Sequence, residues 1–176
     1  MTNNSHPTVK ERVTLRKVLI SQSEANASIA PAGSWLDLDK VATVELSSED
    51  PEHPFEHALR PNANEGWKAA TPGPQVIRIR FDAPSLIRRV HLVFLEEIKE
   101  RAQEIALFAT QKADPRRELV RQQWVFSPSG SKNEVEDFYF DLRDVVMLEL
   151  QIDAGRHNKE VFATLQTIQI SNSTPH

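Results

Sequence analysis

The stretch GWKAATPGPQVIRIRFDAPSLIRRVHLVF, from Gly66 to Phe94, contains two runs in which apolar and polar residues alternate. The apolar residues of the two runs are Ile77, Ile79 and Phe81, and then Val90, Leu92 and Phe94. A period of two with one polar face is typical of half-buried strands in an antiparallel sheet. The residues DAPS separate the runs, and Pro84 is expected to end the first because proline cannot donate to a ladder. The stretch therefore predicts two neighbouring strands.

Similar short runs, separated by Pro, Gly, Ser and Asn, continue along the chain. Further strand candidates are RVTLRKVLIS (12–21), VATVELSSED (41–50, running into a turn), ELVRQQWVFS (118–127), VEDFYFDL (135–142), VVMLELQID (145–153) and ATLQTIQIS (163–171). PFEHALRP (54–61) fits one helical turn. About eight or nine short strands with this punctuation predict an all-β antiparallel sandwich.

The segment EEIKERAQEIALFATQ (96–111) fits two structures. Its first apolar residues have helical spacing and its composition favours helix. Its second half also alternates as a strand does. We favour a turn over Glu96–Arg101, helical or not, and a strand from about Gln103.

The length, composition and charge of the chain exclude several classes of protein and of functional site. The 176 residues suit one domain, with a loose tail at 1–11 and a single sandwich over 12–172. The chain has no cysteine, which excludes disulfides, thiolate metal sites and cysteine nucleophiles. The formal net charge of -4 disfavours nonspecific binding of nucleic acid, so nucleic acid is not an expected partner. No apolar run is long enough to span a bilayer or serve as a signal peptide, so we expect a cytoplasmic protein.

No motif indicates catalysis. The serines lack the strand–turn–helix context of a nucleophile elbow, and the five glycines form no phosphate-binding loop. His53 and His57 have the spacing of a zinc pair, but Pro54 lies between them and no third ligand is in view. We therefore expect no enzyme, no cofactor and no metal site.

The pattern as a whole resembles the discoidin-like domains, also called coagulation factor 5/8 type C or galactose-binding-like domains. The resemblance rests on the Gly66–Phe94 stretch, on the serine turn of 41–61 and on ELQIDAGRHNKEVFATLQTIQIS (149–171), and it covers about residues 35–171. It implies a jelly-roll sandwich of about eight strands that binds sugars, phospholipid head groups or proteins through loops at one end. It also implies that Trp67 plugs the core where that end closes, with Gly66 supplying a permissive backbone.

Two positions depart from this family. Many members hold calcium through an acidic residue after the helical turn and a glutamate at the start of the last strand. Here Arg60 and Thr167 occupy those positions. Calcium is held by several oxygen ligands, usually including carboxylates, so we expect no calcium site.

A second resemblance rests on GWKAATPG and WVFSPSGSKNEV, which are similar to the N-terminal domain of the eukaryotic single-strand-break repair scaffold. That domain shares the sandwich. In the same region Arg78, Arg80, Arg89 and His91 would face outward from the two opening strands, and Arg116, Arg117 and Arg121 form a second basic cluster. These residues fit either a solvated face balanced by acids, which we favour, or a phosphate-binding face.

The resemblance places candidate ligand residues in three loops. They are Trp35, Arg60, Asn62, Asn64, Lys68, Arg156, His157 and Asn158. Arginine and asparagine present several fixed donors to hydroxyls, carboxylates or phosphates, although asparagine is also a common turn former. Trp35 fits a sugar-stacking platform and a core position equally well. We predict a non-catalytic binding module with carbohydrate as a candidate ligand; the alternative is an intracellular protein-interaction domain or a subunit of a larger assembly.

Overall fold

A 21-residue strand, β3 (Gln75–Leu95), passes through both layers of the sandwich in the computed structural model, which describes residues 35–60, 65–155 and 160–174. It contains both of the alternating runs that were expected to form separate strands. That expectation was wrong because β3 continues through Pro84. The pairing of β3 with β6 (Asn133–Asp153) shifts register between Arg80 and Arg89. Pro84 lies at this irregularity, so its missing N–H removes no ladder hydrogen bond.

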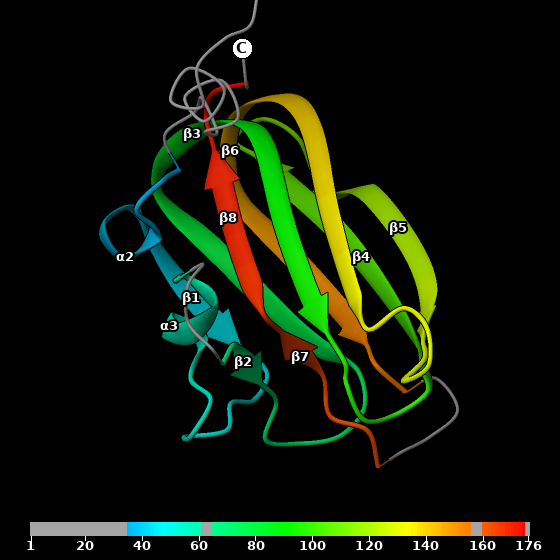
Figure 1. Cartoon of the computed structure of the whole chain (residues 1–176). Helices are drawn as coiled ribbons and strands as arrows, with labels where there is room; N and C mark the ends of the chain where they lie inside the picture. The colour runs from blue at the N-terminus through cyan, green and yellow to red at the C-terminus, as the bar shows by residue number, and fades with distance from the viewer. Residues whose placement is uncertain (1–34, 61–64, 156–159, 175–176) are drawn as a thin grey trace, which may run out of the picture. The chain divides into compact units, whose positions relative to one another are not determined.

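The two layers share β3 and β6 (Figure 1). In the first layer the order is β1 (Ala42–Leu46), the first half of β3, the second half of β6, β4 (Arg101–Gln111) and β5 (Arg117–Phe126). In the second layer, β8 (Thr167–Ser171), the second half of β3 and the first half of β6 lie side by side. All these pairings are antiparallel, which confirms the predicted sandwich.

The core lies between the layers and takes residues from both halves of β3. Ile77, Ile79 and Phe81 are at most 7% exposed, and Val90, Leu92 and Phe94 are fully buried. The buried residues of β3 have odd numbers from Gln75 to Ile87 and even numbers from Val90 to Phe94. The irregular pairing absorbs this change of phase, so both runs face the interior although the strand changes layer.

Strand pairing decided the ambiguous segment at 96–111. It forms β4 from Arg101 onward and contains no helix. Residues 105–109 are all buried, on both faces of the strand, which explains why the sequence showed no single periodicity. The runs at 135–142 and 145–153, expected to be separate, are both part of β6. The segment 163–171 divides into β7 (Thr164–Leu165) and β8.

Two short helices among the described residues lie beside the sheets. Helix α3 (Phe55–Ala58) follows Pro54 as predicted, whereas α2 (Leu38–Val41) was not expected. No helix among the described residues has the length and apolar character needed to cross a membrane. The strand predicted at 12–21 and the tail at 1–11 lie outside the described residues, so the domain limits stay a prediction.

Candidate functional site

Gly66 lies where two chain segments meet at one end of the sandwich. It precedes β2 (Trp67–Lys68), which pairs with β7 through Trp67 opposite Leu165. A Cβ at Gly66 would meet the carbonyl oxygen of Leu165 and lie 2.5 Å from the Cα of Gln166. The glycine is therefore required by close backbone approach. Trp67 is 1% exposed, in agreement with its expected place in the core.

The β2–β7 pair forms one wall of an open groove of about 410 Å³. The loop at 95–99, between β3 and β4, also lines the groove. Side chains that line the groove include His53, Lys68, Leu95, Glu97, Ile98 and Phe162. Glu65–Lys68, from the predicted binding loop at 60–68, and Glu160, the last residue of the predicted loop at 153–160, therefore line the same groove.

Buried Arg101 holds the 95–99 loop in place. Its guanidinium is 2.7 Å from Glu96 and donates to the side chain of Gln103 at 2.6 Å. It also donates to the carbonyl of Ala154 at 3.3 Å, and it lies 5.1 Å from the ring centre of Phe126. These contacts join the loop to β6 and to the core.

The Glu96 carboxylate closes the loop on itself. It accepts hydrogen bonds from the backbone N–H groups of Ile98 and Lys99, both at 3.1 Å, and from Arg101. Burial acts to raise the pKa of Glu96, but these three donors outweigh burial and hold the pKa below its ordinary value. Glu96 is therefore an ionised carboxylate near neutral pH.

The groove combines apolar and charged side chains. Ile98 is 82% exposed, and the ammonium group of Lys68 lies 5.6 Å from the ring centre of Phe162. Glu65, Glu97 and Glu160 also line the groove. Such a surface can bind the C–H face of a sugar or the side chains of a peptide. Nothing in this arrangement pairs a nucleophile with a base.

The predicted site residues divide between two places. Lys68 lines the groove, whereas Trp35 and Arg60 line a separate hollow of about 90 Å³. Asn62, Asn64, Arg156, His157 and Asn158 lie outside the described residues. The expected convergence of Arg60 with these five residues on one ligand therefore stays a prediction.

Trp35 is part of a stacked arrangement on the outer face of the second layer. Its ring lies 4.7 Å from the guanidinium carbon of Arg89, which is also 5.6 Å from the ring centre of Tyr139. Arg89 is also 2.6 Å from Asp137, which lies 3.1 Å from His91. The ring of Trp35 thus already stacks on Arg89, which weakens the case for a sugar platform there.

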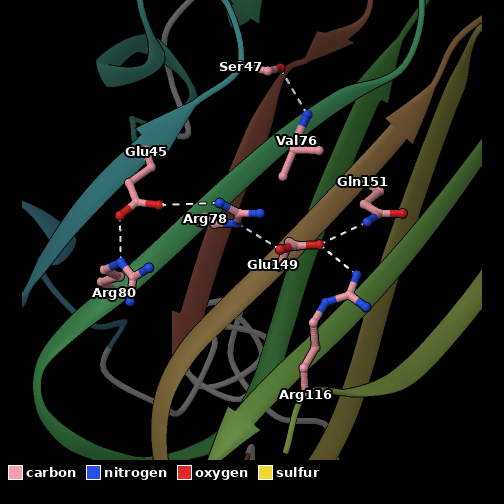
Figure 2. A network of polar contacts seen from close by, with 8 residues as sticks. All are labelled: Glu45, Ser47, Val76, Arg78, Arg80, Arg116, Glu149 and Gln151. Atoms are coloured by element: carbon pink, nitrogen blue, oxygen red, sulfur yellow. Dashed lines mark hydrogen bonds and ion pairs between the residues drawn. The ribbon is translucent and has the colours of Figure 1, made fainter.

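The outer face of the first layer carries Arg78 and Arg80 (Figure 2). Arg80 lies 2.5 Å from Glu45, and Arg78 lies 2.8 Å from Glu149. Because β3 changes layer, Arg78 and Arg80 are on a different face from Arg89 and His91. The continuous basic strip considered from the sequence is therefore not formed, and the favoured interpretation of a balanced face agrees with these ion pairs.

Glu149 is the centre of this network. Its residue is 3% exposed, and its carboxylate accepts from Arg78 at 2.8 Å, from Arg116 at 2.7 Å and from Gln151 at 2.8 Å. Burial alone would raise the pKa of Glu149, but the three donors hold it below its ordinary value. Arg116 also covers the ring of Phe108, 3.5 Å from its centre. This contact explains why Phe108 is buried although it points outward from β4.

The second predicted basic cluster is also largely neutralised. Arg121 lies 2.6 Å from Glu104 and 2.7 Å from Glu118, and Arg116 is bound to Glu149 as described above. Ion-paired arginines of this kind offer little net charge to a phosphate backbone.

No group of three or more histidines, acids or cysteines within 35–60, 65–155 and 160–174 is arranged to hold a metal ion. His53 lies 3.4 Å from Asp50 and 3.9 Å from Glu65, which fits paired surface groups. Asn62 and Asn64 fall outside these ranges, so the expected absence of calcium stays a prediction.

Sequence reasoning did not select the groove residues Glu96, Ile98 and Phe162, or the buried Arg101. An apolar residue inside the charged turn EEIKER was the available signal for Ile98. Nothing local marks Arg101 as buried, because its partner Ala154 lies 53 positions away in the sequence.

Comparison with known proteins agrees with this architecture. The family model of the XRCC1 N-terminal domain matches residues 36–138. No protein in a search of curated sequences matches the chain.

Solved structures of similar fold include carbohydrate-binding modules and XRCC1 itself. The family 32 module of NanJ from C. perfringens, solved with galactose, has a TM-score of 0.56 and 15% identity over 78% of this chain and 97% of that chain. Reduced XRCC1 bound to the DNA polymerase β catalytic domain has a TM-score of 0.54 and 16% identity, over the same shares of the two chains. A pectin-binding module has a TM-score of 0.54 and 16% identity over 76% and 91%. At these identities the likeness concerns the fold, and it confirms the galactose-binding-like sandwich.

The family match covers more than half of the chain, and the structure has the fold that the match implies. The matched family consists of non-catalytic binding domains, which confirms that the chain is not an enzyme. The chain belongs to the XRCC1 N-terminal domain family and is a non-catalytic binding domain with a galactose-binding-like fold.

Proposed function

We propose that this chain binds another protein and acts as a subunit of an assembly inside the cell. The family match over residues 36–138 carries this proposal. It favours the protein-interaction alternative drawn from the sequence over carbohydrate binding.

The surface is compatible with a protein partner. Large apolar side chains are exposed on different parts of the fold, among them Ile98 at 82%, Val125 at 56% and Tyr139 at 53%. A charged side chain beside Tyr139, that of Arg89, is held in an ion pair with Asp137. Exposed apolar groups surrounded by oriented charges are typical of surfaces that bind proteins.

The first partner to test is a DNA polymerase of the β type, because the XRCC1 structure was solved with the catalytic domain of that enzyme. The purified chain and such a domain, mixed at about 50 µM each so that micromolar complexes form, should elute together in size-exclusion chromatography with light scattering. Separate elution of the two proteins would contradict this partner.

Carbohydrate binding is the second candidate function, because the groove offers the ring of Phe162 with the ammonium group of Lys68 close to it. An aromatic face with a neighbouring donor suits a sugar ring. Titration with galactose should then change the resonances of Lys68 and Phe162, and Lys68→Ala should reduce the effect. Resonances that stay unchanged at millimolar sugar would remove this candidate.

A polymerase partner acts on DNA, so we propose that the chain acts inside the cell where DNA is present. This replaces the narrower expectation of a cytoplasmic location. Imaging of the tagged full-length chain tests it, and a signal that is excluded from DNA would contradict it.

A further inference from the structure

The first half of β6, Asn133–Leu142, has a free edge. It pairs with β3 on one side, from Val90 opposite Phe138 to Leu95 opposite Asn133. The pairing of β6 with β4 begins only at Val145. Among the described residues no strand pairs with the other side of Asn133–Leu142. Such an edge presents unpaired backbone N–H and C=O groups, which are a template for an added strand.

Both faces of this edge carry apolar side chains. Val135 and Tyr139 point outward and are 52% and 53% exposed. Phe138 and Phe140 point inward and are partly buried, with ring centres 6.4 Å apart. The stretch contains no proline and no lysine, which are common protections of an exposed edge. An added strand would therefore bury apolar surface as well as pair its backbone.

The charged residues of the edge are all acidic. Asn133–Leu142 contains four acids and no lysine or arginine. Asp137 and Asp141 already have basic partners, Arg89 at 2.6 Å and Arg88 at 3.4 Å. The two inward acids, Glu134 and Glu136, have no basic partner among the described residues.

The carboxylate of Glu136 is hydrogen-bonded to a side chain of β5. The amide of Gln122 on β5, turned so that its nitrogen faces the carboxylate, donates to both oxygens of Glu136 at 2.9 and 3.0 Å. Burial, together with repulsion from Glu134, raises the pKa of Glu136. A positive charge placed beside this pair would relieve the repulsion.

We propose that the free edge of Asn133–Leu142 binds an extended, basic segment of a partner protein as an added antiparallel strand. Alternate side chains of the segment would be apolar opposite Phe138 and Phe140, and lysine or arginine opposite Glu134 and Glu136. The inference rests on the proposed protein-binding function and assigns it a surface and a partner chemistry.

The same acids disfavour a second copy of this chain as the partner. Antiparallel self-pairing of an edge with four acids and no base leaves carboxylates without basic partners, which is unfavourable. The acids thus act against self-association and in favour of a basic strand.

The test uses the full chain and a labelled peptide, Val-Thr-Val-Thr-Arg-Thr-Lys, whose residues pair in order with positions 140 to 134. Fluorescence anisotropy measures its affinity, and hydrogen exchange locates it. We expect binding that protects backbone amides within 133–142. No binding, or protection located elsewhere, would overturn the proposal.

Matched peptides and variants separate strand addition from general charge attraction. A peptide with proline at its third position keeps the charge but cannot pair fully, and a peptide with glutamate at both basic positions reverses the charge. Each should bind about tenfold more weakly. The double variant Glu134→Lys, Glu136→Lys should no longer bind the basic peptide and should bind the acidic peptide instead. The control Glu52→Lys, Glu56→Lys makes the same charge change at two exposed acids and should leave affinity unchanged.

The outcomes also distinguish this proposal from the proposed function. A protein partner that binds the Glu134→Lys, Glu136→Lys variant as tightly as the wild type would overturn the edge proposal and leave the protein-binding function intact. Equal affinity of all three peptides would likewise overturn strand addition. Light scattering that shows a dimer broken by the double variant would identify a second copy as the occupant and overturn the basic-segment proposal.

Discussion

At the scale of the residue, Gly66 occupies a position where the backbone leaves no room for a side chain. A Cβ there would lie 2.5 Å from the Cα of Gln166, the residue that follows β7, so Gly66→Ala must push β2 and β7 apart. We expect a loss of about 3 kcal/mol in the free energy of unfolding, measured by urea denaturation. Gly130→Ala is the control, because a Cβ there has its nearest neighbour at 3.7 Å. Equal effects of the two substitutions would contradict the close approach.

Glu149 gives a prediction about pH. Its pKa is lowered in the folded state, so its ionised form stabilises the fold above the unfolded value of about 4.3. This contribution is lost as pH falls through the folded pKa. Glu149→Gln should cost about 1–2 kcal/mol at neutral pH because Arg78 and Arg116 lose a charged acceptor.

The stability difference between wild type and Glu149→Gln should shrink as pH is lowered from about 5. Thermal unfolding followed across pH measures it. Glu52→Gln, a change at an exposed acid, serves as the control. A difference that stays constant down to acid pH would show that the network does not depend on ionised Glu149.

At the scale of the element, the loop between β3 and β4 depends on one buried ion pair. Arg101→Met would leave Glu96, 16% exposed at its side chain, without its cation. We expect a loss of about 3 kcal/mol in stability and faster tryptic cleavage at Lys99. Arg80→Met, which removes a half-exposed pair with Glu45, should cost less than about 1 kcal/mol.

Comparable proteolysis of the Arg101→Met and Arg80→Met variants would contradict the anchoring role of Arg101. Rescue by Arg101→Lys should be incomplete, since a lysine cannot reproduce the guanidinium contacts to Glu96 and Gln103 together.

At the scale of the whole molecule, β3 and β6 belong to both layers, so neither layer can open without disturbing the other. Backbone amides in the core of the two layers should therefore exchange with the same free energy, within about 1 kcal/mol. Hydrogen exchange under native conditions measures this, with amides of Ile79 and Leu92 as representatives. Exchange of Leu92 at several kcal/mol lower cost than Ile79 would show that the layers open separately.

The sequence alone determined the parts of the fold that depend on local alternation. The inward residues of β3 follow from period-two patterning, because burial of apolar surface acts on each position separately. The core position of Trp67 was implied by the resemblance to a known family. The resemblance to a known fold implied that the loops at 60–68 and 153–160 lie at one end of the sandwich, and Lys68 and Glu160 line the same groove.

Only the tertiary structure decided how distant segments meet. It joined the two runs of the opening stretch into one strand, placed Arg78 and Arg89 on different layers, and separated Lys68 from Trp35 and Arg60. Strand register, the burial of Arg101 and the free edge of β6 depend on contacts between residues far apart in sequence. Local alternation cannot specify these features, since the same pattern is compatible with several pairings until the layers pack.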